Sequence, residues 1–432
     1  MTATPSAPGA PNTLGALEAA RRIEAGDLTV EALVEACLER IAERDGEVGA
    51  FIHIDPEAVR LAARAARADG PLRGLPVAVK DLIDTADLPA EYGSPIWAGN
   101  RPAEDAAVVA RTKAAGGLIL GKTVTTEFAW RRPGKTRNPH DLGHTPGGSS
   151  SGSAAAVADC MAPLAFGTQT AGSVIRPAAY CGVVGFKPTF GTHDRRGVKL
   201  LAEYLDTVGV FARSVEDIAF FDYALRGETM PRLDGFDGNA PRLAIHVPFA
   251  DRIDDDAAAA LERARIAAQT AGARVVALVD WTAYEAMDAV HTTIMTAGAA
   301  RALAWEYDNA RDQLSDFYRD TLAEGRAIDD AAYYEAQARA DAFRNEAVVR
   351  LDGIDAILTV PASGEAPAGI EWTGDPLFNK IWTLLRWPCV TIPAGRGSHG
   401  LPVGVQIVTG YGEDARALAV ASWLERALAA VE

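Results

Sequence analysis

The sequence predicts an α/β protein folded as one large domain. Two observations support this fold class. Short apolar runs typical of buried strands alternate with segments of helical periodicity, and no Gly/Ser/Pro-rich linker or internal repeat divides the 432 residues. Length by itself would allow about two or three domains. We therefore expect residues 13–432 to form a single domain, preceded by a flexible tail over residues 1–12.

In the N-terminal half, apolar residues recur at helical spacing between residues 29 and 43 and place Cys37 on the buried face. The run GLPVAVK at 74–80 is short and apolar and follows the turn Asp69-Gly70-Pro71, so it reads as a buried strand that ends on Lys80. The expected elements of this half are helices at 29–43, 56–68 and 105–115 and strands at 74–80 and 118–120.

The same alternation continues through the C-terminal half. The stretch from about 193 to 350 is helical, acidic and rich in aromatic residues, most of which we expect to pack in the core. The expected elements of this half are strands at 243–247, 275–279, 356–360, 390–393 and 403–408, and helices at 254–271 and 414–431.

Composition excludes several classes of function. A formal net charge of −16 and a pI near 5.0 argue against binding nucleic acid or an anionic membrane, both of which favour basic patches. No apolar run reaches the roughly 18 residues that a membrane-spanning helix needs. The four cysteines form no Cys-x-x-Cys pair and are too sparse for a disulfide framework, which favours a reducing cytoplasm.

Two motifs match known patterns but lack the required context. Residues 116–123 satisfy the phosphate-loop pattern G-x-x-x-x-G-K-T, yet a helix precedes them and Leu-Ile-Leu fills the middle, whereas a phosphate loop follows a strand and opens a helix. A nucleotide site at Gly116–Thr123 is therefore a weak alternative. His140 and His144 have metal-ligand spacing for a helix, but Pro139 prevents a regular helix there, and we expect no metal site.

The densest Gly/Ser cluster, TPGGSSSGS at 145–153, runs directly into the apolar segment 154–158. A flexible linker is one interpretation, although linkers rarely join a core helix so closely. The cluster also contains G-x-S-x-G with Ser150 in the nucleophile position of a hydrolase elbow. That motif needs a preceding apolar strand, and residues 140–145 are polar, so the elbow interpretation is weak.

A family resemblance appears when these segments are combined with FGTQTAGSVIRPA at 166–178 and CGVVGFKPT at 181–189. The Lys80 strand, the Gly-Gly-Ser-Ser cluster and this Gly-Ser loop, in this order, resemble the amidase signature family of serine hydrolases. The resemblance implies a central mixed β-sheet covered by helices on both faces. It also implies a signature core over about 74–190 and a variable helical region over about 193–350 that shapes the substrate pocket.

The resemblance implies a Ser–Ser–Lys catalytic unit, with Ser173 as nucleophile, Ser149 as bridging serine and Lys80 as base. Lysine acts as a base only while it is neutral, which burial favours. Family members hold the bridging serine through a cis peptide, here expected between Gly148 and Ser149. Backbone N–H groups of Thr170, Ala171 and Gly172, with Ser173 itself, would stabilise the oxyanion. The family uses no metal or other cofactor.

The loop departs from the commonest family pattern, Gly-Thr-Asp-x-Gly-Gly-Ser-Ile-Arg. Gln169 replaces the aspartate, Ala171 replaces a glycine, and Arg176 follows the nucleophile by three residues instead of two. This resembles the malonamidase-like branch, in which such an arginine holds a substrate carboxylate. A buried structural ion pair explains Arg176 equally well. Aromatic residues that could line the pocket or the core are Trp372, Phe378, Trp382 and Trp387.

The predicted function is that of a cytoplasmic hydrolase of small amides, with carbamates or esters as further substrates of the same acyl chemistry. Its partners would be a small-molecule amide and water, with neither nucleic acid nor membrane; homodimers are common in the family. The main alternative is the glutaminase component of a tRNA-dependent amidotransferase, its A subunit. The altered loop and the short C-terminal half argue against that alternative.

Overall fold

The computed structural model describes residues 9–234, 240–278 and 281–431. Its strands are β1 (Phe51–His53), β2 (Pro76–Lys80), β3 (Leu118–Thr123), β4 (Leu164–Gln169), β5 (Val184–Lys187), β6 (Thr207–Ala212), β7 (Arg242–Ile245), β8 (Arg274–Ala277), β9 (Ala356–Thr359), β10 (Cys389–Arg396) and β11 (Pro402–Val408). The α-helices are α1 (Ala16–Ala25), α2 (Val30–Val48), α3 (Pro56–Ala65), α4 (Ala107–Ala114), α5 (Ser151–Ala158), α6 (Ile175–Cys181), α7 (Val215–Arg226), α8 (Asp255–Thr270), α9 (Tyr284–Ala302), α10 (Ala304–Asn309), α11 (Asp316–Ala327), α12 (Asp330–Val348), α13 (Leu377–Leu384) and α14 (Asp414–Ala429).

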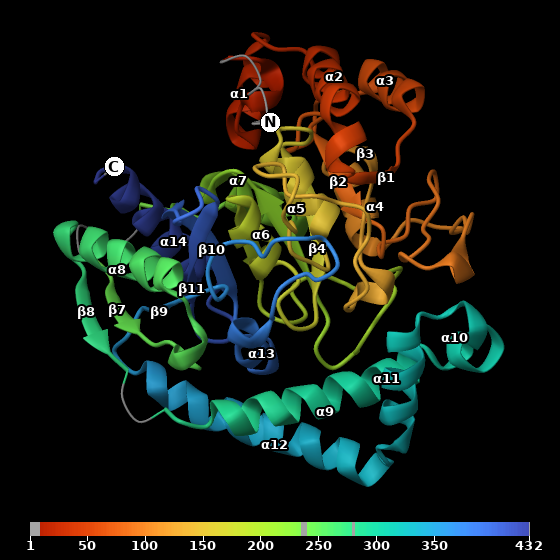
Figure 1. Ribbon diagram of the computed structural model, residues 1–432. Coiled ribbons are helices and arrows are strands. Elements are labelled where there is room, and N and C mark those ends of the chain that lie inside the picture. The colour runs from red at the N-terminus through yellow and green to blue at the C-terminus, as the bar shows by residue number, and fades with distance from the viewer. Residues whose placement is uncertain (1–8, 235–239, 279–280, 432) are drawn as a thin grey trace.

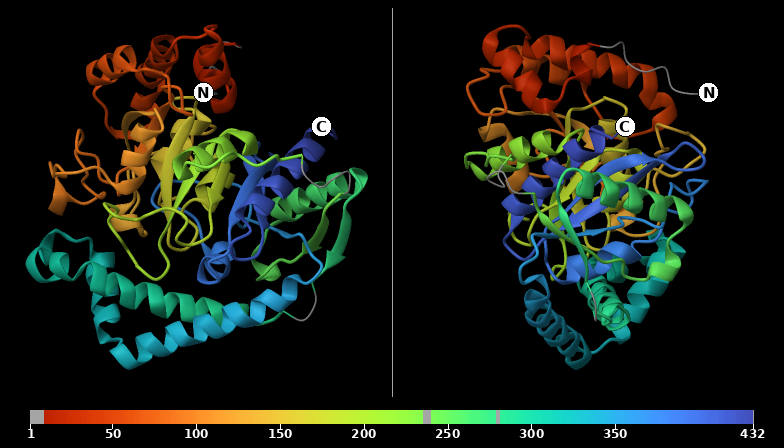
Figure 2. Two further views of the ribbon diagram at one scale, coloured as in Figure 1. Left: turned by 180° about the vertical axis from the view of Figure 1, so that it is seen from behind. Right: turned by 90° about the vertical axis from the view of Figure 1, so that its left-hand side faces the viewer.

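The strands form one mixed sheet in the order β1-β3-β2-β4-β6-β5-β10-β11-β9-β7-β8. Strand β2 runs parallel to β3 and β4, and β7 runs parallel to β8 and β9, whereas the other neighbours are antiparallel. Helices α5 and α6 pack together on one face, and α7, α8 and α14 cover the other (Figures 1 and 2). The predicted single α/β domain with a mixed sheet is confirmed.

The helices begin where the sequence supplies capping groups. Thr29 accepts a hydrogen bond from the N–H of Ala32 at the start of α2. Asp55 and Asp254 cap α3 and α8 in the same way, and Pro56 occupies the first turn of α3. The predicted elements therefore match these helices closely. The predicted strand at 275–279 ends at Ala277, and its last residue, Val279, lies outside the described residues.

The predicted tail ends earlier than residue 12. Residues 1–8 lie outside the described part of the chain, but Pro11–Thr13 form a 3₁₀ turn against the body of the protein. The side-chain amide of Asn12 is buried and donates to the carbonyl oxygen of Cys160 at 3.1 Å. Cys37 lies in the core, as predicted, where burial raises the pKa of its thiol to about 12.

Helices α9 to α12 form an arm that extends beside the sheet (Figure 1). The arm reaches the loop after β3 through Tyr318 of α11, whose buried hydroxyl lies 2.9 Å from the carbonyl oxygen of Glu127 and 3.0 Å from that of Phe128. Phe128 and Ala129 have φ angles of 40° and 65°, a left-handed conformation that non-glycine residues rarely adopt. Contacts with the arm therefore fix an unfavourable turn.

We expect Tyr318→Phe to lower the free energy of unfolding by about 1–2 kcal/mol, because two buried carbonyl oxygens lose the one hydroxyl proton that lies within reach of both. Urea denaturation would measure this change. Tyr334→Phe is the matched control, since Tyr334 lies in the same arm but is 62% exposed, and it should leave stability within about 0.5 kcal/mol of wild type. Equal changes in the two variants would contradict the proposed role of the hydroxyl.

Candidate active site

Lys80 ends β2, a strand that lies between two parallel neighbours near the middle of one half of the sheet. Its side chain is fully buried, and Nζ lies 2.6 Å from Ser149 Oγ and 2.8 Å from Thr168 Oγ1. It makes no ion pair with any residue that the structure describes. Burial lowers the pKa of Lys80 well below its usual value, and the charge of Asp206 only partly opposes this effect. A neutral amine that can accept a proton follows from this environment.

The Gly148–Ser149 peptide bond is cis, as the family resemblance implied. Ser149 is buried, and its carbonyl oxygen accepts a hydrogen bond from the N–H of Thr126 at 3.3 Å. A Cβ atom at Gly148 would lie 2.7 Å from Thr373 Cγ2, so only glycine fits without movement. These contacts hold the Ser149 hydroxyl against Lys80.

Ser173 lies between β4 and α6, with its carbonyl oxygen accepting from the N–H of Ser150 at 3.4 Å. This contact brings the Gly-Ser loop next to the Gly-Gly-Ser-Ser cluster. Gln169 Oε1 accepts from the N–H groups of Val174 and Ile175 at 2.9 and 3.1 Å, so a neutral amide holds the start of α6. These hydrogen bonds allow Gln169 to hold the loop that carries Ser173.

A cavity of about 240 Å³ opens above this loop, with Thr170, Ala171, Ser173 and Arg176 in its wall. Gln169 and Gly172 do not line it. The remaining wall comes from residues 129–131, 201, 292, 295, 372–376 and 380. Trp372 is therefore a pocket residue, whereas Phe378, Trp382 and Trp387 are buried in the core. The cavity is slightly smaller than the roughly 300–1,000 Å³ of typical ligand pockets, which suits a small substrate.

Arg176 is buried beneath the cavity and makes no ion pair with a described residue, so the structural ion pair considered from the sequence is not found. Its Nε donates to the carbonyl oxygen of Thr373 and its Nη2 to that of Gly148, both at 2.8 Å. The third nitrogen, Nη1, is buried without a hydrogen-bond partner among the described residues. Burial lowers the pKa of Arg176 to about 10, so the side chain stays cationic at neutral pH.

Three polar residues of this region were not singled out from the sequence. Thr168 accepts a hydrogen bond from Lys80, Asp206 accepts one from Thr170, and the ring of His291 lies 2.9 Å from the carbonyl oxygen of Thr170. Thr168 lies within the signature segment at 166–178 and was within reach of sequence reasoning. Asp206 directly precedes β6 and His291 lies in α9, and only the fold brings them to the loop.

Residues of the phosphate-loop pattern, the hydrolase elbow and the histidine pair make structural contacts instead. Lys122 of the phosphate-loop pattern lies in β3, buried and ion-paired to Asp81 at 2.9 Å, so it has no open phosphate-binding loop around it. Ser150 hydrogen-bonds the backbone of Thr168 through its hydroxyl and does not line the cavity. His140 lies in a loop with its ring 2.9 Å from the carbonyl oxygen of Cys181.

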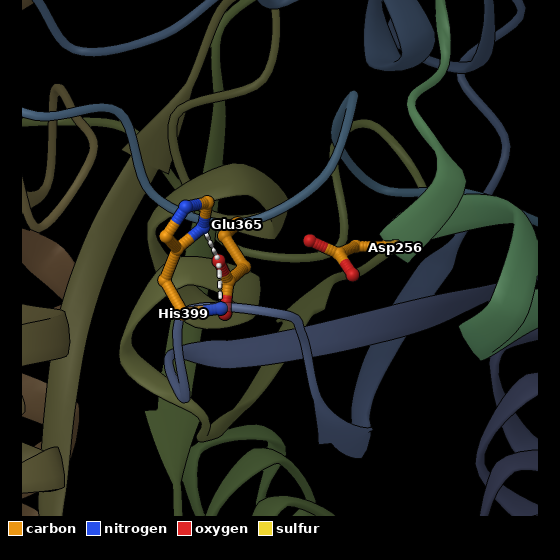
Figure 3. A group of neighbouring side chains, drawn as sticks. All are labelled: Asp256, Glu365 and His399. Atoms are coloured by element: carbon orange, nitrogen blue, oxygen red, sulfur yellow. Dashed lines mark hydrogen bonds and ion pairs between the residues drawn. The ribbon is translucent and has the colours of Figure 1, made fainter.

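One group of described residues has the composition of a metal site: Asp256, Glu365 and His399 (Figure 3). Glu365 already accepts hydrogen bonds from the backbone N–H groups of His399 and Leu401 and contacts the His399 ring at 2.8 Å. Asp256 accepts from the N–H and hydroxyl of Ser398. These contacts fasten the β10–β11 hairpin to α8, and none of the three residues lines the cavity.

A family model described as Amidase matches residues 32–418 of the chain. The chain belongs to the amidase family. Its relatives in this family include the A subunit of the glutamyl-tRNA(Gln) amidotransferase of Anaeromyxobacter dehalogenans, which is 34% identical with 96% of each chain covered.

Among solved structures, an amidase is 32% identical with a TM-score of 0.86 and coverage of 96% of this chain and 99% of the other. The peptide amidase of Stenotrophomonas maltophilia is 29% identical with a TM-score of 0.83 and 96% of each chain covered. The resemblance drawn from the sequence is thereby confirmed, and the protein is an amidase-family enzyme acting on carbon–nitrogen bonds. Among the described residues, no helix combines the length and apolar character needed to cross a membrane.

Proposed function

We propose that this amidase-family protein hydrolyses a small amide through an acyl-enzyme on Ser173, with Ser149 and Lys80 carrying the proton. The observation that carries this proposal is the buried Lys80 amine, which hydrogen-bonds Ser149 and lacks a carboxylate partner in the described chain. Burial lowers the pKa of this lysine well below its usual value, which favours the neutral form that can act as a base. Ser173, which lines the cavity and whose carbonyl oxygen accepts from the N–H of Ser150, the residue after Ser149, is the nucleophile.

In the proposed reaction, Lys80 takes the proton of Ser149 while Ser149 takes that of Ser173. The Ser173 oxygen forms a bond to the acyl carbon, and the resulting oxyanion is stabilised by backbone N–H groups of the loop from Thr170 to Ser173. The proton returns along the same path to the leaving amine as the C–N bond breaks. Water then attacks the ester by the same relay and releases the acid.

Charge in the cavity favours a substrate with a carboxylate. The wall carries Arg131, Arg176 and Lys380 against a single carboxylate, Asp375, in a protein whose net charge is −16. Lys380 is already paired with Asp288 at 2.8 Å, whereas Arg176 Nη1 has no partner among the described residues. An arginine nitrogen in this state is a ready donor to a carboxylate. The proposed substrate is therefore the monoamide of a small dicarboxylic acid.

A second candidate is the glutaminase reaction of an amidotransferase. It is favoured by the names of relatives that align over almost the whole chain. Glutamine is also an amide with a carboxylate, which Arg176 would bind, while its ammonium would face the exposed Asp375. The same acyl-enzyme chemistry would serve it, and released ammonia would pass to partner proteins. The two candidates differ in whether the acyl group carries an ammonium.

The test compares kcat/KM for a dicarboxylic monoamide, its neutral diamide, glutamine, an aryl amide, a carbamate and an ester in wild type and Arg176→Met. We expect the monoamide to be the best substrate and Arg176→Met to reduce its kcat/KM about 10- to 100-fold, the value of a charged hydrogen bond. Turnover of the diamide is the control, because it reports any disturbance of the carbonyl groups that Arg176 also holds. Preference for glutamine would favour the second candidate, and equal losses for monoamide and diamide would contradict carboxylate binding.

A further inference from the structure

Asp206 directly precedes β6 and lies beside the end of β4, where Gln169 pairs with Thr207. Its carboxylate is buried and fully engaged. Oδ1 accepts from the hydroxyl of Thr170 at 2.5 Å, and Oδ2 accepts from the backbone N–H groups of Leu201 and Ala202 at 2.7 and 2.9 Å. Asp206 therefore fixes the first residue of the loop that carries Ser173.

The same carboxylate acts on the proposed base. Lys80 donates to Thr168 Oγ1, and Thr168, Thr170 and Asp206 line a common cavity of about 10 Å³, close to the space of one water molecule. The negative charge of Asp206 raises the pKa of Lys80, while burial lowers it. Because Gln169 is neutral where the commonest family loop has aspartate, the loop itself contributes no carboxylate to this balance.

The charged groups around Asp206 leave it ionised near neutral pH. Burial raises the pKa of Asp206 to about 6, against the lowering effects of Thr170, two backbone N–H groups and Arg195. Arg195 Nη1 also lies 3.2 Å from the backbone oxygen of Asp206. Lys199 lines the small cavity but is ion-paired with Glu306, and Tyr318 lies near enough for Asp206 to raise its pKa.

We propose that Asp206 is a positioning residue of the acyl-transfer site: it holds the oxyanion loop through Thr170, and its charge keeps Lys80 a stronger base than burial alone would allow. This inference rests on the proposed function, since it assigns Asp206 a role only if Lys80 is the base. A base whose pKa falls too far below the working pH loses driving force for proton transfer. Asp206 thus supports both the geometry of the loop that stabilises the oxyanion and the proton relay through Lys80.

The test is the pH profile of kcat/KM for Asp206→Asn and Thr170→Val. Lys80 must be neutral to act, so activity rises with pH through its pKa. Removing the Asp206 charge lowers that pKa. The acid limb, which is the part of the profile where kcat/KM rises with pH, should move to lower pH by about one unit, and the plateau that kcat/KM reaches above it should be lower. Thr170→Val keeps the Asp206 carboxylate but removes a hydrogen bond that lowers its pKa. Its plateau should fall about tenfold, and its limb should move less than that of Asp206→Asn.

An unmoved acid limb in folded Asp206→Asn, as judged by circular dichroism, would overturn the proposal. If that variant does not fold, Arg195→Met replaces it. Arg195 lowers the pKa of Asp206, so its loss leaves Asp206 less ionised near neutral pH and should move the limb to lower pH. An unmoved limb there would also overturn the proposal. Lys80→Met separates the two hypotheses: an acid limb that persists in this variant would refute the proposed function itself, whatever Asp206 does.

Discussion

Replacing Ser173 by alanine should abolish turnover, with kcat reduced at least about 10⁴-fold, as expected for the loss of a covalent nucleophile. Alanine removes the oxygen that would bond to the acyl carbon and leaves the cavity and the backbone N–H groups in place. Intact-protein mass spectrometry with a slowly turned-over ester provides the direct measurement. Wild type should show an added acyl mass, and Ser173→Ala should show none.

Ser150→Ala is the matched control, because Ser150 occupies the nucleophile position of the rejected hydrolase elbow. Its hydroxyl hydrogen-bonds the backbone of Thr168 in the described structure, and its loss should cost at most about tenfold in kcat. The acyl adduct should still form. An adduct that survives in Ser173→Ala but disappears in Ser150→Ala would reverse the assignment of the nucleophile.

Lys80→Met should lower kcat by about 10³–10⁴-fold, the upper range for loss of a general base. Methionine fills a similar volume in this fully buried position and cannot accept a proton. The wild-type profile should rise with pH as Lys80 loses its proton, at a pH well below the usual value for lysine because burial lowers its pKa. The residual activity of the variant should lack this ionisation.

A second buried lysine serves as the control for Lys80. Lys187 is also fully buried, burial also lowers its pKa, and it donates to the carbonyl oxygens of Pro188 and Trp387, away from the serines. Lys187→Met should reduce stability, because it leaves buried carbonyl groups without a donor. Its kcat per folded molecule should stay near that of wild type. Equal loss of kcat in both variants would point to a general packing effect.

Most of the sheet could be predicted from apolar runs, but β1, β4, β5 and β6 could not. Strand β1 is only 3 residues long, and each of the others contains a glycine that interrupts the apolar pattern. A Cβ at Gly167 would lie 2.6 Å from the Phe211 ring, and one at Gly209 would lie 2.6 Å from the carbonyl oxygen of Phe186. Tertiary crowding therefore requires glycine in strands where local propensity disfavours it. Local sequence carries no record of that requirement.

The site likewise divides into residues that sequence motifs revealed and residues that only the fold brings to it. Lys80, Ser149 and Ser173 lie in motifs that sequence reasoning recognised, and the fold brings those motifs together. The surroundings of Arg176 could not be read from the sequence, because its acceptors are the carbonyl oxygens of Gly148 and Thr373, the latter 197 residues away. Asp206 likewise reaches the loop only through the pairing of β4 with β6. Motifs reveal reacting groups, whereas the groups that tune them depend on long-range pairing.

Because the helical arm is attached to the cavity wall, changes in substrate selectivity can arise separately from changes in catalysis. Trp130 of the wall packs edge-on against Phe317 and Tyr318 of α11, while Lys80 and Ser173 belong to the central sheet and its connections. Substitutions in the arm can therefore reshape the wall and alter which acyl groups enter, without contact with the groups that break the bond. For enzyme engineering, libraries confined to α10–α12 should yield altered selectivity at lower risk to turnover than libraries in the signature loops.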